Sequence, residues 1–255
     1  MHPAALFDLT GKTALVTGAS RGIGQSIAQL LAAHGAHVIV SSRRLDACEQ
    51  VAQGIREAGG QATAIAAHIG ETAALDALFG QIDAAGLKLD ILINNAAANP
   101  YYGPMLDMSL DAFVKTADVN IRGYWYASLL AGRRMRDQGG GSIVNIASVN
   151  GRRPAWGQGV YSFSKAAIIS MTQAFAKELA GYKIRVNAVL PGLTDTKFAS
   201  AMTQNEAVLK MILPLIPMQR IAQPDEIAPA ALYLASPAAS YVTGTCLTVD
   251  GGMLA

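Results

Sequence analysis

Short apolar runs alternate with longer helical patterns along almost the whole chain of 255 residues. The runs are rich in valine and isoleucine, and most are apolar throughout rather than at every second position. Continuous apolar runs are typical of strands that are covered on both faces, as in a parallel sheet. The predicted strands are Thr13–Thr17, His37–Ser41, Ala62–Ala67, Ile91–Asn94, Ser142–Ala147, Ile184–Leu190 and Cys246–Val249.

The helical patterns lie between these runs. The predicted helices are Ile23–Ala33, Leu45–Ala58, Ala73–Ala84, Leu110–Arg136, Val160–Ala180 and Asp225–Leu234. Regular strand–helix alternation favours the α/β class, with one Rossmann-like, doubly wound domain over residues 1–255 and a parallel sheet of seven strands. One apolar segment, at about 192–223, breaks the alternation and contains Pro214 and Pro217. We expect a substrate-loop insert there, mobile rather than buried.

Composition excludes several classes of function. The net charge of +2 indicates neither nucleic acid nor an anionic membrane as partner. No apolar run reaches the roughly 18 residues that a membrane span needs. Cys48, Cys246 and the four histidines lack the spacing of metal ligands, so no metal site is expected. The first residues lack a signal-peptide pattern, and we expect a soluble, cytoplasmic protein.

A glycine-rich stretch, Gly18-Ala19-Ser20-Arg21-Gly22-Ile23-Gly24, joins the first strand to a helix. Glycines here allow a tight turn and let a pyrophosphate approach the backbone, while the helix N-terminus offers N–H groups and a positive dipole end. Glycines alone are also compatible with a plain turn, but their place after the first strand favours dinucleotide binding. The predicted contacts are Gly18, Ser20, Arg21, Gly22, Ile23 and Gly24.

The end of the second strand indicates which dinucleotide is preferred. Chains that bind NAD carry an acidic residue about 20 positions beyond the glycine turn, whereas arginine accommodates the 2′-phosphate of NADP. Here the strand ends in Ser42-Arg43-Arg44, with no acid before Asp46. We therefore predict that NADP(H) is preferred over NAD(H), held by Ser42, Arg43 and Arg44 with Arg21 approaching from the glycine turn. The alternative is that these arginines only face solvent.

Tyr161 and Lys165 stand four residues apart in a predicted helix and so share one face. An adjacent cation lowers the pKa of a phenol by roughly 1–3 units from about 10, which suits general acid–base catalysis near neutral pH. Ser148 ends an apolar strand, where α/β folds place ligands. We expect Ser148, Asn150 and Tyr161 to contact a substrate. Taken alone, the spacing of Tyr161 and Lys165 favours a buried tyrosine beside an exposed lysine, and only the rest of the chain favours a catalytic pair.

Seven motifs occur in a fixed order: the glycine turn at 17–24, Asn94-Asn95-Ala96, Asn120, Ser148, Tyr161 with Lys165, Pro191-Gly192, and Val249-Asp250-Gly251-Gly252. In this order the chain resembles the short-chain dehydrogenase/reductase (SDR) family over nearly its whole length. The resemblance implies a catalytic set of Asn120, Ser148, Tyr161 and Lys165. In that family the tyrosine exchanges the proton and the serine orients the substrate oxygen. The lysine holds the nicotinamide ribose and lowers the tyrosine pKa, and the asparagine backbone holds a water of the proton relay.

The resemblance also implies the remaining cofactor contacts, which are His68, Ile69, Asn95, Ala96, Tyr161, Lys165, Pro191, Gly192, Thr194 and Thr196. The chain departs from the family pattern at Ala97, where glycine is usual, and at His68, where an aspartate usually meets the adenine. The segments His68-Ile69-Gly70 and Asn95–Pro100 look like those of NADPH-dependent carbonyl and retinoid reductases of the dehydrogenase/reductase member 4 type.

The function predicted from these features is hydride transfer between NADP(H) and a ketone or secondary alcohol of small-molecule size. One alternative is a 3-oxoacyl-[acyl-carrier-protein] reductase, for which Arg133, Arg134, Arg136, Arg152 and Arg153 would form a docking patch or merely a solvated face. A non-catalytic dinucleotide-binding regulator is a weaker alternative, since it predicts a broken catalytic set. The resemblance implies a homo-oligomer, either dimer or tetramer. Candidates for a hydrophobic pocket are Tyr101, Tyr102, Asn150, Trp156, Met202, Leu209, Met211, Ile212, Leu213, Leu215 and Ile216.

Overall fold

The computed structural model describes residues 6–203 and 206–255. Its centre is a seven-stranded parallel sheet with the order β3-β2-β1-β4-β5-β6-β7, which confirms the predicted fold class. The strands are β1 Thr13–Thr17, β2 His37–Ser42, β3 Gln61–Ala66, β4 Ile91–Asn94, β5 Gly141–Ile146, β6 Ile184–Pro191 and β7 Cys246–Val249. Each predicted strand is present, with shifts of one residue at some ends.

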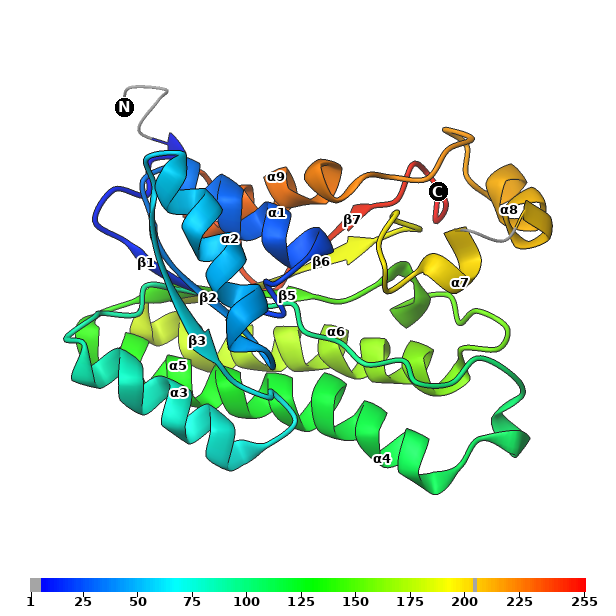
Figure 1. Ribbon diagram of the computed structural model, residues 1–255, viewed down its shortest axis with the longest axis horizontal. Coiled ribbons are helices and arrows are strands. Elements are labelled where there is room, and N and C mark those ends of the chain that lie inside the picture. The colour runs from blue at the N-terminus through cyan, green and yellow to red at the C-terminus, as the bar shows by residue number, and fades with distance from the viewer. Residues whose placement is uncertain (1–5, 204–205) are drawn as a thin grey trace.

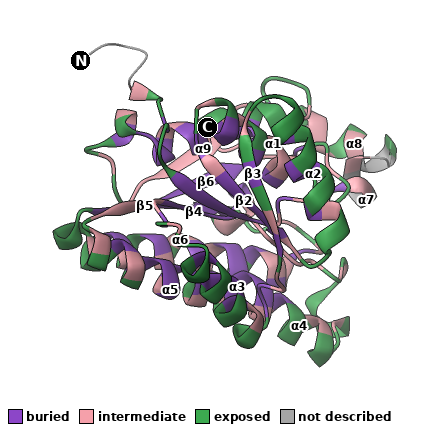
Figure 2. Ribbon diagram, turned by 60° about the vertical axis from the view of Figure 1, so that its left-hand side comes forward, coloured by how far each residue is buried: buried purple, intermediate pink, exposed green. Residues whose placement is uncertain are grey.

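Helices cover both faces of the sheet (Figure 1). One layer contains α1 Gly22–Ala33, α2 Leu45–Glu57 and α9 Pro224–Ala235. The opposite layer contains α3 Thr72–Ala84, α5 Gly123–Gln138 and α6 Gly159–Leu179. Two apolar cores result, one on each face, and the central strands between them are buried throughout (Figure 2). Burial on both faces explains why these strands are continuously apolar in the sequence.

The segment predicted as one helix, Leu110–Arg136, is divided in the structure. It forms α4 Leu110–Ala117, the π-helical turn η3 Asp118–Arg122, and then α5. At the junction Gly123 packs so closely on the strand-end loop that a Cβ would lie 2.6 Å from the Ile69 carbonyl oxygen. The three elements follow one another without a gap and are all helical, which explains why the sequence predicts one continuous helix.

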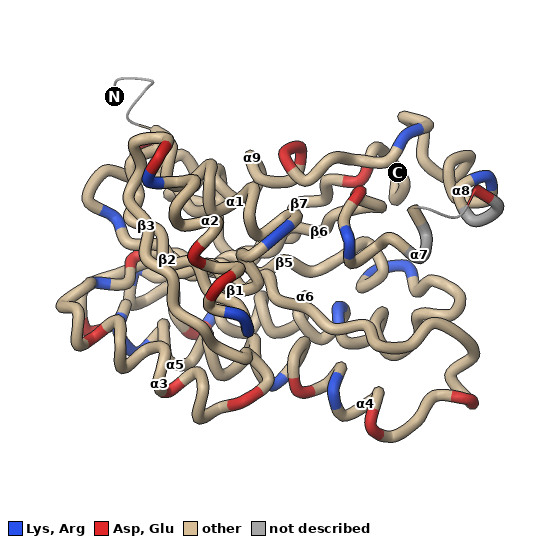
Figure 3. Tube along the Cα trace, viewed as in Figure 1, with Lys and Arg blue, Asp and Glu red and all other residues tan. Residues whose placement is uncertain are grey.

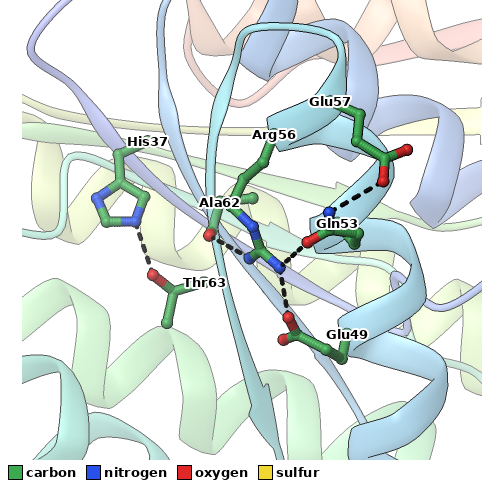
Figure 4. Close-up of polar contacts among 7 residues, drawn as sticks. All are labelled: His37, Glu49, Gln53, Arg56, Glu57, Ala62 and Thr63. Atoms are coloured by element: carbon green, nitrogen blue, oxygen red, sulfur yellow. Dashed lines mark hydrogen bonds and ion pairs between the residues drawn. The ribbon is translucent and has the colours of Figure 1, made fainter.

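Polar contacts hold α2 against the outer strands (Figure 4). Arg56 of α2 donates to the Ala62 carbonyl of β3 at 3.0 Å. It also forms an ion pair with Glu49, two turns earlier in the same helix. The His37 ring on β2 lies 2.9 Å from the Thr63 hydroxyl on β3. These contacts fix the β2–α2–β3 unit, from whose strand ends Ser42 and His68 extend.

Helices α1 and α9 lie side by side, although they are far apart in the sequence. Apolar side chains of both helices belong to the same core, and the Ser26 hydroxyl donates to the Asp225 carboxylate at 2.6 Å. The first turn of α9 is closed by a capping box between Gln223 and Glu226, and this fixes the start of the helix. The first and last thirds of the chain therefore share one packed layer.

The segment 192–223 leaves the sheet after β6 and returns at the start of α9. It contains α7 Ser200–Thr203, α8 Glu206–Ile212 and the 3₁₀ turn η6 Leu213–Leu215, which lie at one end of the molecule (Figure 1). Its two ends meet where Ala222 N–H donates to the Leu193 carbonyl at 3.0 Å and Asp195 N–H donates to the Ala222 carbonyl at 2.8 Å. The segment is thus a closed excursion from the sheet rather than part of its helical layers.

Candidate active site

A cavity of about 1060 Å³ opens at the carboxyl edge of the sheet. Its wall takes residues at or just beyond the carboxyl ends of six successive strands of the chain: Gly18, Ser42, His68, Asn95, Ser148 and Pro191. The strand order reverses direction between β1 and β4, and in open α/β sheets ligands bind at such a switch point. Of the predicted site residues, all but Asn120 line this cavity.

The glycine turn presents bare backbone to the cavity. Gly18 and Gly22 have φ angles of 65° and 57°, in the left-handed region that favours glycine. At Gly24 a Cβ would lie 2.3 Å from the Asn95 Nδ2 and 2.5 Å from the Gly18 carbonyl oxygen, so no side chain fits. The N-terminus of α1 has no side-chain cap, and its first N–H groups remain for a ligand. This donor set fits the pyrophosphate of a dinucleotide.

Asn95 and Thr17 connect the glycine turn to the end of β4. Asn95 Nδ2 donates to the carbonyls of Thr17 and Gly18 at 3.0 and 3.1 Å. The backbone N–H groups of Asn95 and Ala96 both point to the Thr17 hydroxyl, at 3.0 and 3.3 Å. Asn95 therefore braces the turn as well as lining the cavity, a role that the sequence motif does not reveal.

The two arginines after β2 differ in their partners. Arg44 pairs with Asp46, which raises the pKa of Arg44 and lowers the pKa of the carboxyl group. Arg43 has no ion pair with any residue that the structure describes. Ser42 Oγ lies 3.0 Å from the buried Cys48 thiol. The acid nearest to the strand end is thus already paired, and of the two arginines after β2 only Arg43 has no ion pair among the described residues.

His68 follows β3 and lines the same end. Its Nδ1 accepts a hydrogen bond from the Gly70 N–H at 3.1 Å, so the ring carries its proton on Nε2 when neutral. Ile69 is buried in the core below, and Lys115 of α4 adds a further cation to the wall. Sequence reasoning missed Lys115, because nothing in the helical pattern distinguishes it from other exposed lysines.

Tyr161 and Ser148 meet at the other end of the cavity. Tyr161 lies near the start of α6, and its ring centroid is 5.9 Å from that of Phe198 in the segment 192–223. Burial raises the pKa of Tyr161 to about 12, and a hydrogen bond with Ser148 opposes that rise. The phenol is therefore a protonated group at neutral pH, held beside the Ser148 hydroxyl.

Lys165 is almost completely buried, with 1% of its surface exposed. Its Nζ donates to the Ile146 carbonyl at 2.8 Å and lies 5.6 Å from the centroid of the Tyr161 ring. Burial lowers the pKa of Lys165 to about 7. The sequence predicts instead that Lys165 lowers the pKa of Tyr161. In the structure burial raises the pKa of Tyr161 instead, and the hydrogen bond with Ser148, rather than Lys165, opposes that rise.

Tyr124 of α5 completes the surroundings of Lys165. It is fully buried, its hydroxyl donates to the same Ile146 carbonyl at 3.1 Å, and its ring centroid lies 5.4 Å from Lys165 Nζ. One carbonyl thus accepts both donors. Tyr124 belongs to none of the sequence motifs, although its place four residues after Asn120 puts it on the same side of the helical segment.

Asn120 lies behind the cavity wall, in the π-helical turn η3. Its Oδ1 accepts from the Ala98 N–H at 2.8 Å, and its Nδ2 donates to the Ala98 carbonyl and to Ser164 Oγ, each at 2.9 Å. The side chain is fully used in holding the loop after β4 against α6. Its function is therefore to position Ala98, which does line the cavity.

The segment after β6 closes the cavity from above the glycine turn. Gly192 passes so near the C-terminal turn that a Cβ would lie 2.8 Å from Asp250 Cα. Thr194 and Thr196 line the cavity, and the Thr196 methyl group packs against Gly22. The two threonines and the glycine turn therefore face one another across the dinucleotide end.

The remaining wall is largely apolar. Asn150 donates from Nδ2 to the Gln158 side chain at 2.7 Å, and Tyr102 packs edge-to-face on Trp156 at 6.2 Å. Of the predicted pocket residues, Tyr102, Asn150, Trp156, Met211, Ile212 and Leu215 line the cavity. In the described part of the wall, Tyr101, Leu209, Leu213 and Ile216 are absent, and the Met202 side chain lies outside the described residues. Residues that the sequence analysis missed are Arg153, Lys197, Phe198, Met253 and Leu254.

The fold and the site define a dinucleotide-dependent α/β enzyme. Within the described residues, no group of three or more His, Cys, Asp or Glu side chains could hold a metal ion. In the same part of the chain, no helix is both long and apolar enough to cross a membrane. A family model described as enoyl-(acyl carrier protein) reductase matches residues 18–254. Dehydrogenase/reductase SDR family member 4 of Oryctolagus cuniculus is 34% identical over 244 residues, covering 96% of this chain and 94% of that protein.

Two solved structures have nearly the same fold. The crystal structure of a gluconate 5-dehydrogenase from Burkholderia cenocepacia, in complex with NADP and tartrate, has a TM-score of 0.96, 30% identity and 99% coverage of each chain. A 7α-hydroxysteroid dehydrogenase with NADH and 7-oxo glycochenodeoxycholic acid has a TM-score of 0.93 and 36% identity, covering 99% of this chain and 98% of its own. The chain belongs to the short-chain dehydrogenase/reductase family. It is an NAD(P)-dependent oxidoreductase that acts on CH–OH groups.

Proposed function

We propose that the protein reduces ketones and oxidises secondary alcohols with NADP(H), and that Tyr161 exchanges the proton. The observation that carries the proposal is the pairing of the Tyr161 and Ser148 hydroxyls at the cavity wall, beside a buried Lys165. Two hydroxyl groups in contact form a site for one substrate oxygen, since one can donate while the other orients it. When bound, the nicotinamide supplies or accepts the hydride.

The chain's own residues divide the remaining work. In the reducing direction Tyr161 Oη, whose high pKa keeps it protonated, donates to the substrate oxygen. Ser148 Oγ holds that oxygen, and the Ser148 hydroxyl is itself positioned by the Asn150 N–H at 3.1 Å. Lys165 Nζ, anchored on the Ile146 carbonyl, stands below the phenol and would hold the nicotinamide ribose. Asn120 positions the loop after β4, and its backbone in the π turn would hold the relay water.

The preference for NADP(H) rests on Arg43. It is the free cation at the end of β2, while Asp46, the nearest acid, is occupied by Arg44. An arginine without a partner can grip a 2′-phosphate with two parallel hydrogen bonds. A carboxylate that is already paired is not available to a ribose 2′-hydroxyl. Arg21 in the glycine turn lines the same end and adds charge of the same sign.

Steady-state kinetics with both cofactors test the proposal. A panel of ketones and alcohols is followed by NADPH or NADH absorbance, and kcat/KM for NADPH should exceed that for NADH. Arg43→Ala should cut that ratio by roughly tenfold to a hundredfold, the effect of losing a charged hydrogen bond. Lys88→Ala, an exposed cation outside the cavity, is the matched control and should leave the ratio unchanged. Equal or better use of NADH by the unmodified protein would reject the NADP assignment.

Reduction of a 3-oxoacyl chain on an acyl carrier protein is a second candidate function. The description of the matching family model, enoyl-(acyl carrier protein) reductase, favours a carrier-bound substrate but names a different reaction. Two of the five arginines proposed as a docking patch are partly occupied, since Arg134 pairs with Asp83 and Arg136 with Asp137. Competition between a carrier-bound and a free 3-oxoacyl substrate separates the two functions. We also propose that residues 1–255 act as one domain in which the segment 192–223 is the substrate loop, because Phe198, Met211 and Leu215 of that segment line the cavity.

A further inference from the structure

We propose that the substrate carries a carboxylate, which Arg153 binds directly and Lys197 attracts, while the rest of the substrate lies against apolar side chains. This inference rests on the proposed function, since it names the substrate class of the same site. It concerns residues that neither the family motifs nor the catalytic assignments include.

The cavity wall contains cations and no carboxylates. Acidic and basic residues are interspersed along the chain as a whole (Figure 3), which has 18 Asp and Glu against 20 Lys and Arg. Among the described residues that line the cavity, there is no Asp or Glu. The basic residues of the wall are Arg21, Arg43, Arg44, Lys115, Arg153, Lys165 and Lys197. A cavity walled by one sign of charge attracts ligands of the opposite sign.

These cations fall into two groups. Arg21, Arg43 and Arg44 follow β1 and β2 and belong to the dinucleotide end, and Lys115 lines the wall from α4. Arg153 follows β5 and Lys197 follows β6, next to the catalytic hydroxyls. Strands β5 and β6 are paired neighbours, with Ile146 opposite Val189. The carboxyl ends of parallel neighbours meet at one edge of a sheet, so the second group lies at the substrate end.

Arg153 is presented by a rigid turn. The 3₁₀ turn η4, Val149–Gly151, begins at Ser148, and Arg153 N–H donates to the Val149 carbonyl at 3.0 Å. Gly151 in that turn packs on α6, where a Cβ would lie 2.8 Å from the Lys165 carbonyl carbon. The turn therefore cannot move without disturbing Ser148 and α6. The turn therefore fixes the position of the Arg153 backbone relative to Ser148, the serine proposed to orient the substrate oxygen.

Arg153 and Lys197 are both unpaired. Neither side chain has an ion pair or hydrogen bond with any residue in the part of the chain that the structure describes. The neighbouring Arg152 differs, since it does not line the cavity and hydrogen-bonds the Cys246 thiol. Lys197 precedes Phe198, whose ring lies against Tyr161. The two cations thus reach the substrate end from two different elements.

The rest of this end selects an apolar body. Trp156 and Tyr102 pack on each other in the cavity wall, which also contains Met211, Ile212 and Leu215 of the segment 192–223. A planar guanidinium binds a carboxylate through two parallel hydrogen bonds, whereas lysine acts as a point charge. The ligand that matches both features is an oxo acid or hydroxy acid with an apolar skeleton between its carbonyl or alcohol and its carboxylate.

Binding tests the proposal without relying on turnover. Keto fatty acids, with the ketone at varied distances from the carboxylate, are titrated by calorimetry into the full chain with NADP⁺ present, each beside its primary amide. The best acid should bind about tenfold more tightly than its amide, since one partly exposed charged contact is at stake. Raising the salt concentration should lower the affinity for the acid and leave the affinity for the amide unchanged. Equal affinities for acid and amide, or no binding of either, would overturn the proposal.

Variants then locate the contact. Arg153→Gln should remove the preference for the acid over its amide. Lys197→Gln should reduce the preference by a smaller factor, since lysine does not form the paired hydrogen bonds. Arg152→Gln is the matched control and should keep the preference. If Arg153→Gln lowers the affinity for acid and amide equally, its role is structural and the proposal fails.

A neutral ketone separates this inference from the proposed function. Cyclohexanone lacks a carboxylate, so its reduction depends on the catalytic residues alone. Reduction of cyclohexanone without any preference for acids would reject the carboxylate site and keep the proposed function. Tight binding of a keto acid without reduction of any ketone would keep the carboxylate site and reject the proposed function.

Discussion

Lys165 is buried and Tyr161 is partly buried at the cavity wall, and burial favours the neutral form of each group. The pKa of Tyr161 is raised to about 12 and the pKa of Lys165 is lowered to about 7. Their four-residue spacing predicts that they share a helix face, which is what the structure has. The same spacing does not predict how little water reaches them, because burial depends on Tyr124, Ile146 and other groups from distant elements.

Replacement of Tyr161 by phenylalanine removes the proposed proton donor and little else. We expect Tyr161→Phe to lower kcat by about 10²–10⁴-fold, the usual contribution of general acid–base catalysis. The ring keeps its contact with Phe198, so the melting temperature and the NADPH dissociation constant should change little. Steady-state kinetics, thermal denaturation and fluorescence titration measure the three quantities. A variant that keeps more than about a tenth of the kcat would exclude Tyr161 as the donor.

The lowered pKa of Lys165 has a consequence for stability. In the unfolded chain the amine binds a proton up to its ordinary pKa of 10.5, whereas in the folded protein it releases that proton above about 7. The unfolded state therefore binds more protons between these values, and stability rises with pH across this window. Each unit of pKa difference corresponds to about 1.4 kcal/mol.

Lys165→Met removes this dependence. The melting temperature of the unmodified protein, measured without cofactor from pH 7 to 10, should rise relative to that of Lys165→Met as the pH increases. The Ile146 carbonyl keeps the Tyr124 hydroxyl as its donor in the variant. Lys177→Met, which replaces an exposed lysine of the same helix, is the control and should run parallel to the unmodified protein. Parallel curves for Lys165→Met would contradict the low pKa.

The strands and most helices could be predicted from the sequence, because their apolar patterns reflect burial on both faces of the sheet. The division of Leu110–Arg136 could not, since α4, the π turn at Asn120 and α5 follow one another without a gap and are all helical. The same holds at the site. Motif residues were found by order and spacing, whereas Arg153 and Lys197 carry no motif and gain meaning only when β5 and β6 bring them to one cavity.

The glycine turn and the Asn95 side chain that bonds to it form one structural unit. Gly24 is packed so closely in this unit that a side chain does not fit. In Gly24→Ala the new Cβ would meet the Asn95 side chain and the Gly18 carbonyl, at 2.3 and 2.5 Å. We expect a lower melting temperature and loss of NADPH binding, because the Asn95 bonds to Thr17 and Gly18 must break. Calorimetry and thermal denaturation measure both effects.

Gly54 provides the matched control for this substitution. It lies within α2 and has no heavy atom within 4 Å of a built Cβ. Because alanine is favoured over glycine inside a helix, Gly54→Ala should stabilise the protein by up to about 1 kcal/mol. If both variants behaved alike, the close packing at Gly24 would have no role in forming the cofactor site.

Considered as a whole, the molecule has an apolar surface over α4 and the adjoining part of α6. Leu106 and Leu110 are 99% and 73% exposed, and Phe113 of α4 contacts Phe163 of α6 with ring centroids 6.3 Å apart. Figure 2 shows α4 as an exposed element at the edge of the molecule. Large apolar side chains gathered on one face are typical of an association surface. We propose that this face joins copies of the chain in a homo-oligomer.

Leu110→Glu tests that assembly. Introducing a charge into an apolar contact should lower the molar mass measured by light scattering to that of a smaller species. Ala73→Glu, at an exposed position in the first turn of α3, is the control and should leave the mass unchanged. An oligomer that survives Leu110→Glu, or an unmodified protein that is a monomer, would reject this surface as the interface.

The pairing of α1 with α9 has a consequence for synthesis of the protein on the ribosome. The Ser26–Asp225 contact joins residues 199 positions apart, and both helices bury side chains in one core. When α1 leaves the exit tunnel, its apolar residues Ile27 and Leu31 have no partner from α9 until most of the chain has been translated. Contacts between such distant positions form late in folding and leave apolar surface open to aggregation meanwhile. We therefore expect the nascent chain to expose this apolar face of α1 until α9 has been synthesised.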